Sequence, residues 1–404
     1  MKTISSLLVT IFSVLTLTSL AQNTFIPEGK WRGIFHNANG TAVPFNFEVK
    51  GKTAETAKVY LLNAQERFET GSLTQKGDSL FIPFDQFDAE LAFKIGDKKL
   101  TGVYRKQGVN NATPVEATYG QDYRFEDGEK PTADVSGTYD VVFKSPNGKE
   151  EKTVGLFKQS GNKLYATFMK ITGDSRFLEG TVKGNQFFLS SFIGGGIAYY
   201  TGSVDPAGII TGSNGGSQFT GAKNPTAALP DPYTLTYLKP GYTLFELSLP
   251  DVNGKKVTLK DEKYKNKVVI VTITGTWCPN CIDEANFLAP WFKKNKSRGV
   301  EAIGVHFERK TDEAYVKNAI EKFKKRYGIE YDEVFGGVSD KNVVAKTFPA
   351  LNTFLSFPTI LFIDKKGNVA KIYTGFTGPA TGVYYDHFVK EFNTEIDTLL
   401  KKDI

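Results

Sequence analysis

Hydrophobic and polar residues follow two different patterns along the chain, and the pattern changes near residue 240. Before that point, apolar and polar positions alternate in short runs, which are separated by Asn-Gly and Asp-Pro-Ala-Gly turns. Such alternation is typical of half-buried antiparallel strands, because successive strand side chains point to opposite faces of a sheet. The clearest runs are 43–49, 80–84 and 186–189. This part of the chain is therefore predicted to be an all-β module.

After residue 240 the pattern predicts strands that alternate with helices. The β-branched run 267–273 is typical of a buried parallel strand. Further strands are expected at 299–307, 359–364 and 369–373, and helices at 279–294, from Thr311 onward and at 384–400. The predicted fold class is an α/β C-terminal domain, residues 241–404, that follows an all-β N-terminal module in the sequence.

The β-rich part contains an internal repeat with a nearly constant spacing. The offsets between matched segments are 137−29 = 108, 176−67 = 109 and 212−102 = 110 residues, which indicates a duplicated unit. The matched segments are Gly29-Lys30-Trp31 with Gly137-Thr138-Tyr139, 67–73 with 176–182, and 100–102 with 210–212. We predict two halves, residues 22–128 and 129–229, joined by a charged connector at 122–134. They could form one barrel or two packed lobes, since closing a sheet removes its exposed edges.

The β-rich module has no recognisable catalytic constellation, and we interpret it as a folding and docking module. The alternative is a ligand or partner surface made of its exposed aromatic residues. Gly194 to Gly196 mark the place where such a surface could open, although a flexible loop before a strand is the simpler interpretation. The Pro-rich segment 230–240 predicts a stiff linker between the module and the C-terminal domain.

The N-terminal residues 1–21 predict an export signal. Lys2 supplies a positive charge, an apolar run follows at 7–17, and Ser19-Leu20-Ala21 has the small-x-small form of a cleavage site. A transmembrane anchor is the alternative, which the short, Ser/Thr-interrupted run disfavours. We expect an exported chain that is soluble after cleavage, in the periplasm or another extracytoplasmic space.

Charge and cysteine content narrow the classes of function. The formal net charge of +6 is spread over 404 residues without a basic block, so the sequence does not indicate nucleic acid or a membrane surface as a partner. With only two cysteines, the chain is not a small disulfide-stapled scaffold. If the two cysteines matter, they matter for their chemistry.

Cys278 and Cys281 are separated by Pro-Asn and lie where an apolar strand gives way to a helical pattern. Unpaired backbone N–H groups and the helix dipole stabilise a thiolate at the first turn of a helix. Cys278 is therefore the expected nucleophile, and Cys281 the resolving thiol that attacks the mixed disulfide. Half of a zinc site is the usual alternative for this spacing. No second cysteine pair exists, however, and His306 and His387 lack ligand spacing, so we expect no metal.

Three further segments accompany the cysteine pair. They are Phe245–Asp251 with Gly254–Val257, Trp277 with Glu284 on either side of the cysteines, and Ser356–Thr359 before a predicted strand. Together they resemble the thioredoxin fold, and specifically its TlpA/ResA-type extracytoplasmic branch. The resemblance covers roughly the last 165 residues, about the size of one domain.

The resemblance implies a role for each matched residue. Cys278 and Cys281 match the redox pair, whose reversible disulfide needs no bound cofactor. Pro358 matches the cis-proline that faces this disulfide, keeps metal away and presents the backbone of Phe357 to an extended substrate; an ordinary strand-start proline is the alternative. Trp277 matches the aromatic residue beside the active site.

Glu284 matches an acidic residue that TlpA/ResA-like proteins carry near the disulfide. It could shuttle the proton of Cys281, or it could be a plain first-turn charge favoured by the helix dipole. The sequence departs from the family pattern at two positions. Thr272 stands where ordinary thioredoxins have a buried acid, so a relay from that position is missing, and Asn286 replaces a helix proline.

The function implied is that of a thiol–disulfide oxidoreductase, whose partners are substrate protein disulfides and an upstream thiol electron donor that could be membrane-bound. Reduction is favoured by the resemblance alone, since the Pro279-Asn280 pair leaves the redox potential open. One alternative is a peroxiredoxin-like peroxidase, but the residue seven before Cys278 is Val271 instead of the required proline. Another is a binding protein whose β module carries the main function.

Overall fold

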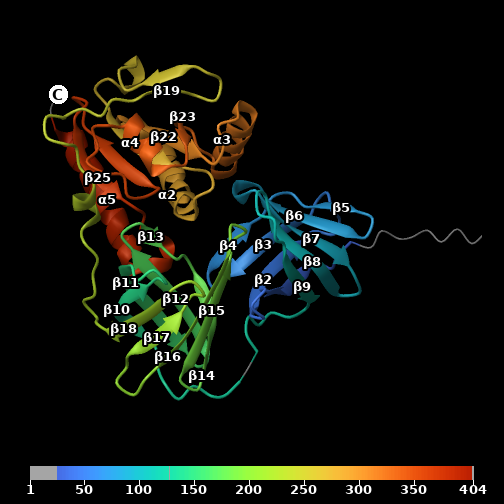
Figure 1. Cartoon of the computed structure of the whole chain (residues 1–404). Helices are drawn as coiled ribbons and strands as arrows, with labels where there is room; N and C mark the ends of the chain where they lie inside the picture. Colours follow the sequence, from blue (N-terminus) through green and yellow to red (C-terminus); the bar gives the residue numbers. More distant parts are fainter. Residues whose placement is uncertain (1–24, 127, 403–404) are drawn as a thin grey trace, which may run out of the picture.

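The computed structural model describes residues 25–126 and 128–402. The predicted export signal at 1–21 lies outside these residues. Figure 1 shows two β-rich lobes and a C-terminal α/β domain that lies against both. Over the described residues, none of the helices combines the length and the apolar character that a membrane crossing requires.

Within residues 25–126, nine strands form one antiparallel sheet in the order β4-β3-β2-β1-β9-β8-β7-β6-β5. The chain between β4 and β5 crosses from one edge of the sheet to the other, because Thr70 N–H donates to Val59 O (2.9 Å) and Gly71 N–H donates to Pro83 O (2.9 Å). These bonds satisfy part of both edges. The strands are β1 (Gly29–His36), β2 (Ala42–Lys50), β3 (Lys58–Asn63), β4 (Glu66–Glu69), β5 (Thr74–Lys76), β6 (Ser79–Phe84), β7 (Ala89–Ile95), β8 (Lys99–Lys106) and β9 (Thr113–Tyr119).

The second lobe is a closed barrel. In the described segment after residue 127, eight strands pair in an unbroken ring, β10-β11-β12-β14-β15-β16-β17-β18 and back to β10. Short β13 (Gly173–Asp174) pairs with the end of β12. The ring strands are β10 (Gly137–Lys144), β11 (Glu150–Ser160), β12 (Lys163–Lys170), β14 (Leu178–Lys183), β15 (Gln186–Phe192), β16 (Ile197–Val204), β17 (Ile210–Ser213) and β18 (Gln218–Lys223). The β-rich module is therefore two lobes rather than one barrel.

The end of β15 reaches out of the barrel and into the first lobe. Phe192 is buried and stacks edge-on against Phe35, Phe45 and Tyr104. Gly194 then follows in close contact, since a Cβ there would lie 2.4 Å from the Phe84 ring, and its carbonyl accepts from Tyr104 Oη (3.0 Å). Gly194 and Gly195 lie against Phe84 and Phe87 of the first lobe, and only Gly196 is exposed, so the sequence interpretations of an open surface or a flexible loop do not describe the first two glycines. They pack one lobe onto the other.

The connector between the lobes places a buried arginine in the same interface. Arg124 is 4% exposed; its guanidinium donates to Leu62 O and to Ser190 Oγ (3.3 Å) and pairs with Glu179 (3.4 Å). These bonds and the ion pair compensate the buried charge, although among the described residues Arg124 Nε is buried without a hydrogen-bond partner. The charged segment expected to be a simple link therefore contributes directly to the packing of the lobes.

In the described chain beyond residue 240, a five-stranded sheet of order β23-β22-β21-β24-β25 is flanked by helices. β21, β22 and β23 are parallel, β24 pairs antiparallel with β21, and β25 pairs antiparallel with β24. The strands are β21 (Val268–Thr274), β22 (Val300–Glu308), β23 (Asp332–Val338), β24 (Thr359–Ile363) and β25 (Val369–Thr374), and β19 (Ser248–Pro250) pairs with β20 (Lys256–Thr258) outside this sheet. The helices are α2 (Pro279–Asn295), α3 (Glu313–Tyr327), α4 (Lys341–Thr347) and α5 (Val383–Lys401). This is the α/β architecture that the sequence predicts, with β23 and α4 added.

The Pro-rich segment before this domain is packed against it. It contains the short helix α1 (Pro232–Leu235), and beyond it Thr236 accepts a hydrogen bond from Thr374 Oγ1 of β25 (2.8 Å) while Leu238 forms a bridge with Leu351. The linker predicted at 230–240 is therefore held against the C-terminal domain. The ring of Tyr233 in α1 also packs edge-on against Tyr373 of β25, so these residues extend that domain.

Candidate functional site

The cysteine pair lies at the N-terminus of α2. Buried strand β21 ends at Thr274, Cys278 is the N-cap of the helix, and Pro279 occupies its first turn, where a missing N–H costs nothing. Cys281 N–H donates to Cys278 Sγ (3.3 Å), and both residues are free thiols. Cys278 is 5% exposed and Cys281 is fully buried. The more accessible sulfur is thus the one held against the helix N-terminus.

The residues on the far side of Cys278 have the predicted arrangement. The Phe357–Pro358 peptide bond is cis, and the Cys278 thiol donates to Phe357 O (3.5 Å). Trp277 donates from Nε1 to Phe307 O (2.8 Å), and its ring packs edge-on against Phe357 at 5.5 Å. The half-buried rings of Trp277 and Phe357 therefore lie together beside the reactive sulfur.

Glu284 is buried beneath the cysteines and is not a solvent-facing helix charge. It is 2% exposed, Thr272 Oγ1 donates to its Oε2 (2.6 Å), and within the described residues its Oε1 is buried without a hydrogen-bond partner. Burial raises the pKa of Glu284 to about 8 against the opposing hydrogen bond from Thr272. The structure therefore contains a buried carboxyl in this site after all. It comes from α2, and Thr272 at the expected position holds it.

Cys281 lies one helical turn before Glu284, so the two side chains are neighbours on α2. Burial raises the pKa of the Cys281 thiol well above its ordinary value, and the neighbouring Cys278 and Glu284 raise it further. Cys281 is thus held as a protonated thiol. To act as a nucleophile it must pass its proton to a nearby base.

A second buried cluster, which the sequence analysis missed, supports the segment before the cysteines. Thr276 donates from its backbone N–H to Glu308 Oε1 (2.9 Å) and from Oγ1 to Glu308 Oε2 (2.7 Å). His306 lies between Glu308 and Glu333; burial alone would lower its pKa, but the two carboxylates raise it to about 10. The sequence did contain a sign of this cluster, since His306, Glu308 and Glu333 are ionisable residues within largely apolar strands.

A third feature missed at the sequence level joins the site to both lobes. Arg176 of the second lobe donates to Pro279 O (2.5 Å), pairs with Asp283 of α2 (2.7 Å) and donates from Nε to Glu66 of the first lobe (3.1 Å). Burial and the Asp174 and Glu66 carboxylates raise the pKa of Asp283 to about 7 although Arg176 opposes this rise. One side chain therefore contacts all three parts of the protein at the cysteine motif.

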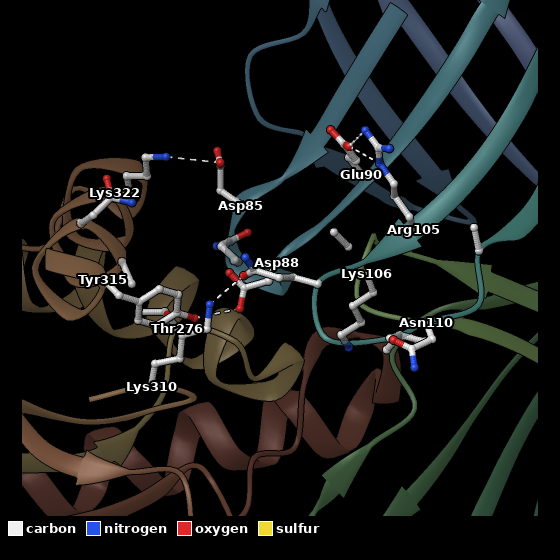
Figure 2. A pocket seen from close by; sticks show the side chains of 17 residues that line it. Asp85, Asp88, Glu90, Arg105, Lys106, Asn110, Thr276, Lys310, Tyr315 and Lys322 are labelled. Carbon is white, nitrogen blue, oxygen red and sulfur yellow. Dashed lines mark hydrogen bonds and ion pairs between the residues drawn. The ribbon is translucent and has the colours of Figure 1, made fainter. Parts of the chain in front are cut away.

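A cleft of about 700 Å³ separates the first lobe from α3. Figure 2 shows that Asp88 and Tyr315 meet across it, where Tyr315 Oη donates to Asp88 (2.9 Å), and that Thr276 lies at its inner end. Thr276 is two residues before Cys278, so this cleft approaches the redox site from the first-lobe side. Over the described residues, no group of three or more His, Cys, Asp or Glu side chains is arranged to hold a metal ion.

Comparison with known proteins places this site in a family context. Residues 240–372 match the AhpC/TSA family model. The chain is 32% identical over 127 residues to the thiol-disulfide oxidoreductase ResA of Bacillus subtilis strain 168, a match that covers 31% of this chain and 63% of that protein. ResA of Geobacillus kaustophilus is 29% identical over 137 residues, with 33% of this chain and 69% of that protein covered. The chain thus spans slightly less than two thirds of the first of these relatives.

Two solved structures align with the chain. A thiol-disulfide oxidoreductase from Bacteroides fragilis is 19% identical with a TM-score of 0.29, covering 37% of this chain and 99% of its own. A thioredoxin family protein from Chlorobium tepidum is 21% identical with a TM-score of 0.30, covering 43% and 99%. The family match and the ResA relatives support the assignment of the C-terminal region as a TlpA/ResA-like domain of the thioredoxin superfamily.

Proposed function

We propose that this protein is an exported thiol–disulfide oxidoreductase that reduces disulfides in extracytoplasmic proteins through Cys278 and Cys281. The observation that carries the proposal is the position of Cys278 Sγ, between the Cys281 N–H at the helix N-terminus and the carbonyl of Phe357. The sulfur therefore has a backbone N–H of the helix N-terminus on one side and the backbone of Phe357 on the other, beside which an extended substrate chain can lie. Export rests on residues 1–21.

The reaction begins at Cys278. Its thiolate attacks one sulfur of a substrate disulfide, a mixed disulfide forms, and the other substrate sulfur leaves as a thiolate that takes up a proton. Because Cys281 is held protonated, it does not compete for this first step. The accessible sulfur therefore reacts first.

The second step requires Cys281 to lose its proton. The carboxylate form of Glu284 accepts it, since the pKa of this group near 8 permits proton exchange around neutral pH. Cys281 then attacks Cys278 Sγ, which releases the second substrate sulfur. The substrate has gained two electrons, and the enzyme carries a Cys278–Cys281 disulfide that an upstream thiol donor must reduce.

Trapping tests the proposal. A Cys281→Ser variant lacks the resolving thiol and is expected to accumulate mixed disulfides through Cys278, which can be identified by mass spectrometry after purification under non-reducing conditions. A Cys278→Ser variant is the matched control and is expected to capture nothing. If the Cys281→Ser variant folds normally and captures no protein, the oxidoreductase proposal is wrong.

The β-rich module is proposed to be a duplicated unit that docks partners or orients the redox domain, with halves at 22–128 and 129–229. Three equivalent features at the repeat offset support this. Trp31 and Tyr139 are both buried and both donate to a carbonyl four residues earlier, and Gly29 and Gly137 both have φ near +135° (133° and 138°). In both lobes the first strand pairs with the second and with the last.

A peroxiredoxin-like peroxidase is the second candidate, because the AhpC/TSA description is that of the matching family model. The position seven before Cys278 is Val271, which is fully buried in the middle of β21 and supplies no polar group to a peroxide pocket. This candidate predicts that the purified protein consumes hydroperoxide with a simple thiol reductant, which the oxidoreductase proposal does not require.

A further inference from the structure

A turn of the second lobe lies against the redox site. This turn, residues 171–176, follows β12 and contains the short strand β13. Ser356, which directly precedes the Phe357–Pro358 pair, donates from Oγ to Thr172 O (2.7 Å). Gly378, in the loop after β25, donates from its N–H to Asp174 Oδ2 (2.7 Å). The turn therefore binds two separate loops on the face that carries the cysteines.

The contact between the turn and the cysteine motif is tight. A Cβ built on Gly173, whose φ is +133°, would lie 1.9 Å from Asn280 Nδ2 in the motif itself. A Cβ on Gly375, whose φ is +78°, would lie 2.8 Å from Ile171 O. Glycine at both positions lets backbone pack where any side chain would clash. The turn therefore packs directly against Asn280, which lies between the two cysteines in the sequence.

Arg176 fixes the turn in place. Its guanidinium donates to Pro279 O and pairs with Asp283 and Glu66, and these three charged side chains are only 8%, 10% and 8% exposed. Buried ion pairs with several hydrogen bonds hold one geometry, because moving either partner leaves an uncompensated charge. The turn is thus a fixed wall rather than a loose loop.

The remaining neighbours of Cys278 are more exposed than the residues that bind the turn. Pro279 is exposed, and the rings of Trp277 and Phe357 are half-buried, whereas Ser356 and Gly378, which bind the turn, are buried. Because Cys278 itself is 5% exposed, little of its surface is accessible to an incoming disulfide. The turn lies beside this small exposed area, where it obstructs a flat folded surface more than a protruding chain segment.

We infer that turn 171–176 determines substrate shape: it restricts Cys278 to disulfides carried on extended or protruding chain segments and excludes those set in a flat folded surface. The inference rests on the proposed oxidoreductase function and adds the class of substrate. The second lobe is then part of the substrate site, and Arg176 is its positioning residue.

Thiol labelling of the full-length chain tests the wall without requiring catalysis. In a Cys281→Ser background, Cys278 is labelled with N-ethylmaleimide and, separately, with a maleimide on a polyethylene glycol chain. The rate with the small reagent divided by the rate with the bulky reagent is the labelling ratio, and it is compared with the labelling ratio of an unstructured cysteine peptide. Both reagents react with the same thiolate, so the ratio reports access alone. We expect the bulky reagent to be disfavoured by about tenfold or more relative to the peptide, and Arg176→Ala to remove most of this difference.

Arg67→Ala is the matched control, because Arg67 occupies the equivalent position at the repeat offset but pairs with Glu48 at the surface. It is expected to leave the ratio unchanged. Ser356→Ala, which removes the bond to Thr172 and a second bond from the same hydroxyl to Phe357 O (3.0 Å), is a milder second variant. It is expected to reduce the preference for the small reagent partway even if Arg176→Ala does not fold. The inference would be overturned if the Cys281→Ser protein had the same labelling ratio as the peptide, or if neither Arg176→Ala nor Ser356→Ala changed its labelling ratio.

Turnover then separates this inference from the proposed function. With the cysteines intact, the protein is expected to reduce a disulfide in an unstructured peptide faster than a disulfide on a folded surface, and Arg176→Ala is expected to narrow that preference. Equal rates with both substrates contradict the shape selection. If neither substrate is reduced but the labelling ratio is as expected, the oxidoreductase function is contradicted, whereas the restriction of access to Cys278 by the turn is supported.

Discussion

Replacing Glu284 with glutamine removes a carboxyl that burial keeps protonated in the folded protein. The pKa of this group is about 8 in the folded state and 4.5 ordinarily. Between these two values the unfolded chain releases a proton that the folded chain retains, so the free energy of unfolding of the wild type falls as the pH rises. Above about pH 8 both states are ionised and the decline stops.

The size of this effect follows from the two pKa values. At about 1.36 kcal/mol per pH unit, the interval from 4.5 to 8 corresponds to about 5 kcal/mol, of which about 3 kcal/mol has been lost by pH 7. Glutamine has nearly the same shape, accepts from Thr272 and does not titrate. The stability of Glu284→Gln relative to the wild type is therefore expected to rise by about 5 kcal/mol from pH 4.5 to 8.5.

Urea unfolding of the reduced proteins at several pH values measures this difference. The pH-independent cost of the substitution cancels, because only the change with pH is compared. Glu321→Gln, which removes an exposed carboxyl from α3, is the control for the loss of one charge. A relative stability that changes by less than about 1 kcal/mol over this range, or that falls with pH, would refute the assignment of a protonated, buried Glu284.

Three further predictions concern the parts of the fold that hold the site. Arg124→Ala is expected to lower the free energy of unfolding by about 3 kcal/mol in urea, because it leaves buried acceptors between the lobes unpaired, and a loss below about 1 kcal/mol would contradict this. Gly180→Ala is expected to cost at least about 1–3 kcal/mol, since its Cβ would lie 1.7 Å from Phe188 O, whereas Gly196→Ala, with nothing within 4 Å, is expected to be near neutral in the same assay. His306→Gln is expected to destabilise the protein at pH 7 and to destabilise it less as the pH approaches 10. The raised pKa of His306 stabilises the fold fully below pH 6.5, and this stabilisation is lost as the pH rises to about 10. An equal loss of unfolding free energy at both pH values would argue against a charged His306.

Much of the redox site was predictable because its determinants are local. A cysteine pair in the first turn of a helix, after a buried β-branched strand, needs only the sequence around it to be recognised, and the structure has that strand and helix within a residue or two of the expected bounds. The cis bond before Pro358 also follows from the matched family motif. By contrast, β23 was missed because its Gly336-Gly337 pair weakens the strand pattern.

Glu284 shows where local reasoning stopped. The sequence left open whether this side chain titrates near the cysteines or faces solvent, because a first-turn glutamate looks the same in both cases. Thr272 comes from a different element, 12 residues earlier, and its hydrogen bond to Glu284 exists only once α2 packs on β21. Burial of the carboxyl, and with it the raised pKa, is a property of that packing.

The sequence alone determined most of the strands and helices of the redox domain, where the reactive cysteines lie and which residues flank them, since these depend on periodicity and on neighbours along the chain. Only the tertiary structure decided what covers them. The contacts of Arg176 with Pro279 and of Thr172 with Ser356 join residues more than 100 positions apart. The pattern of apolar and polar residues predicts which face of an element is buried. Which residues cover that face depends on how the lobes and the redox domain pack together.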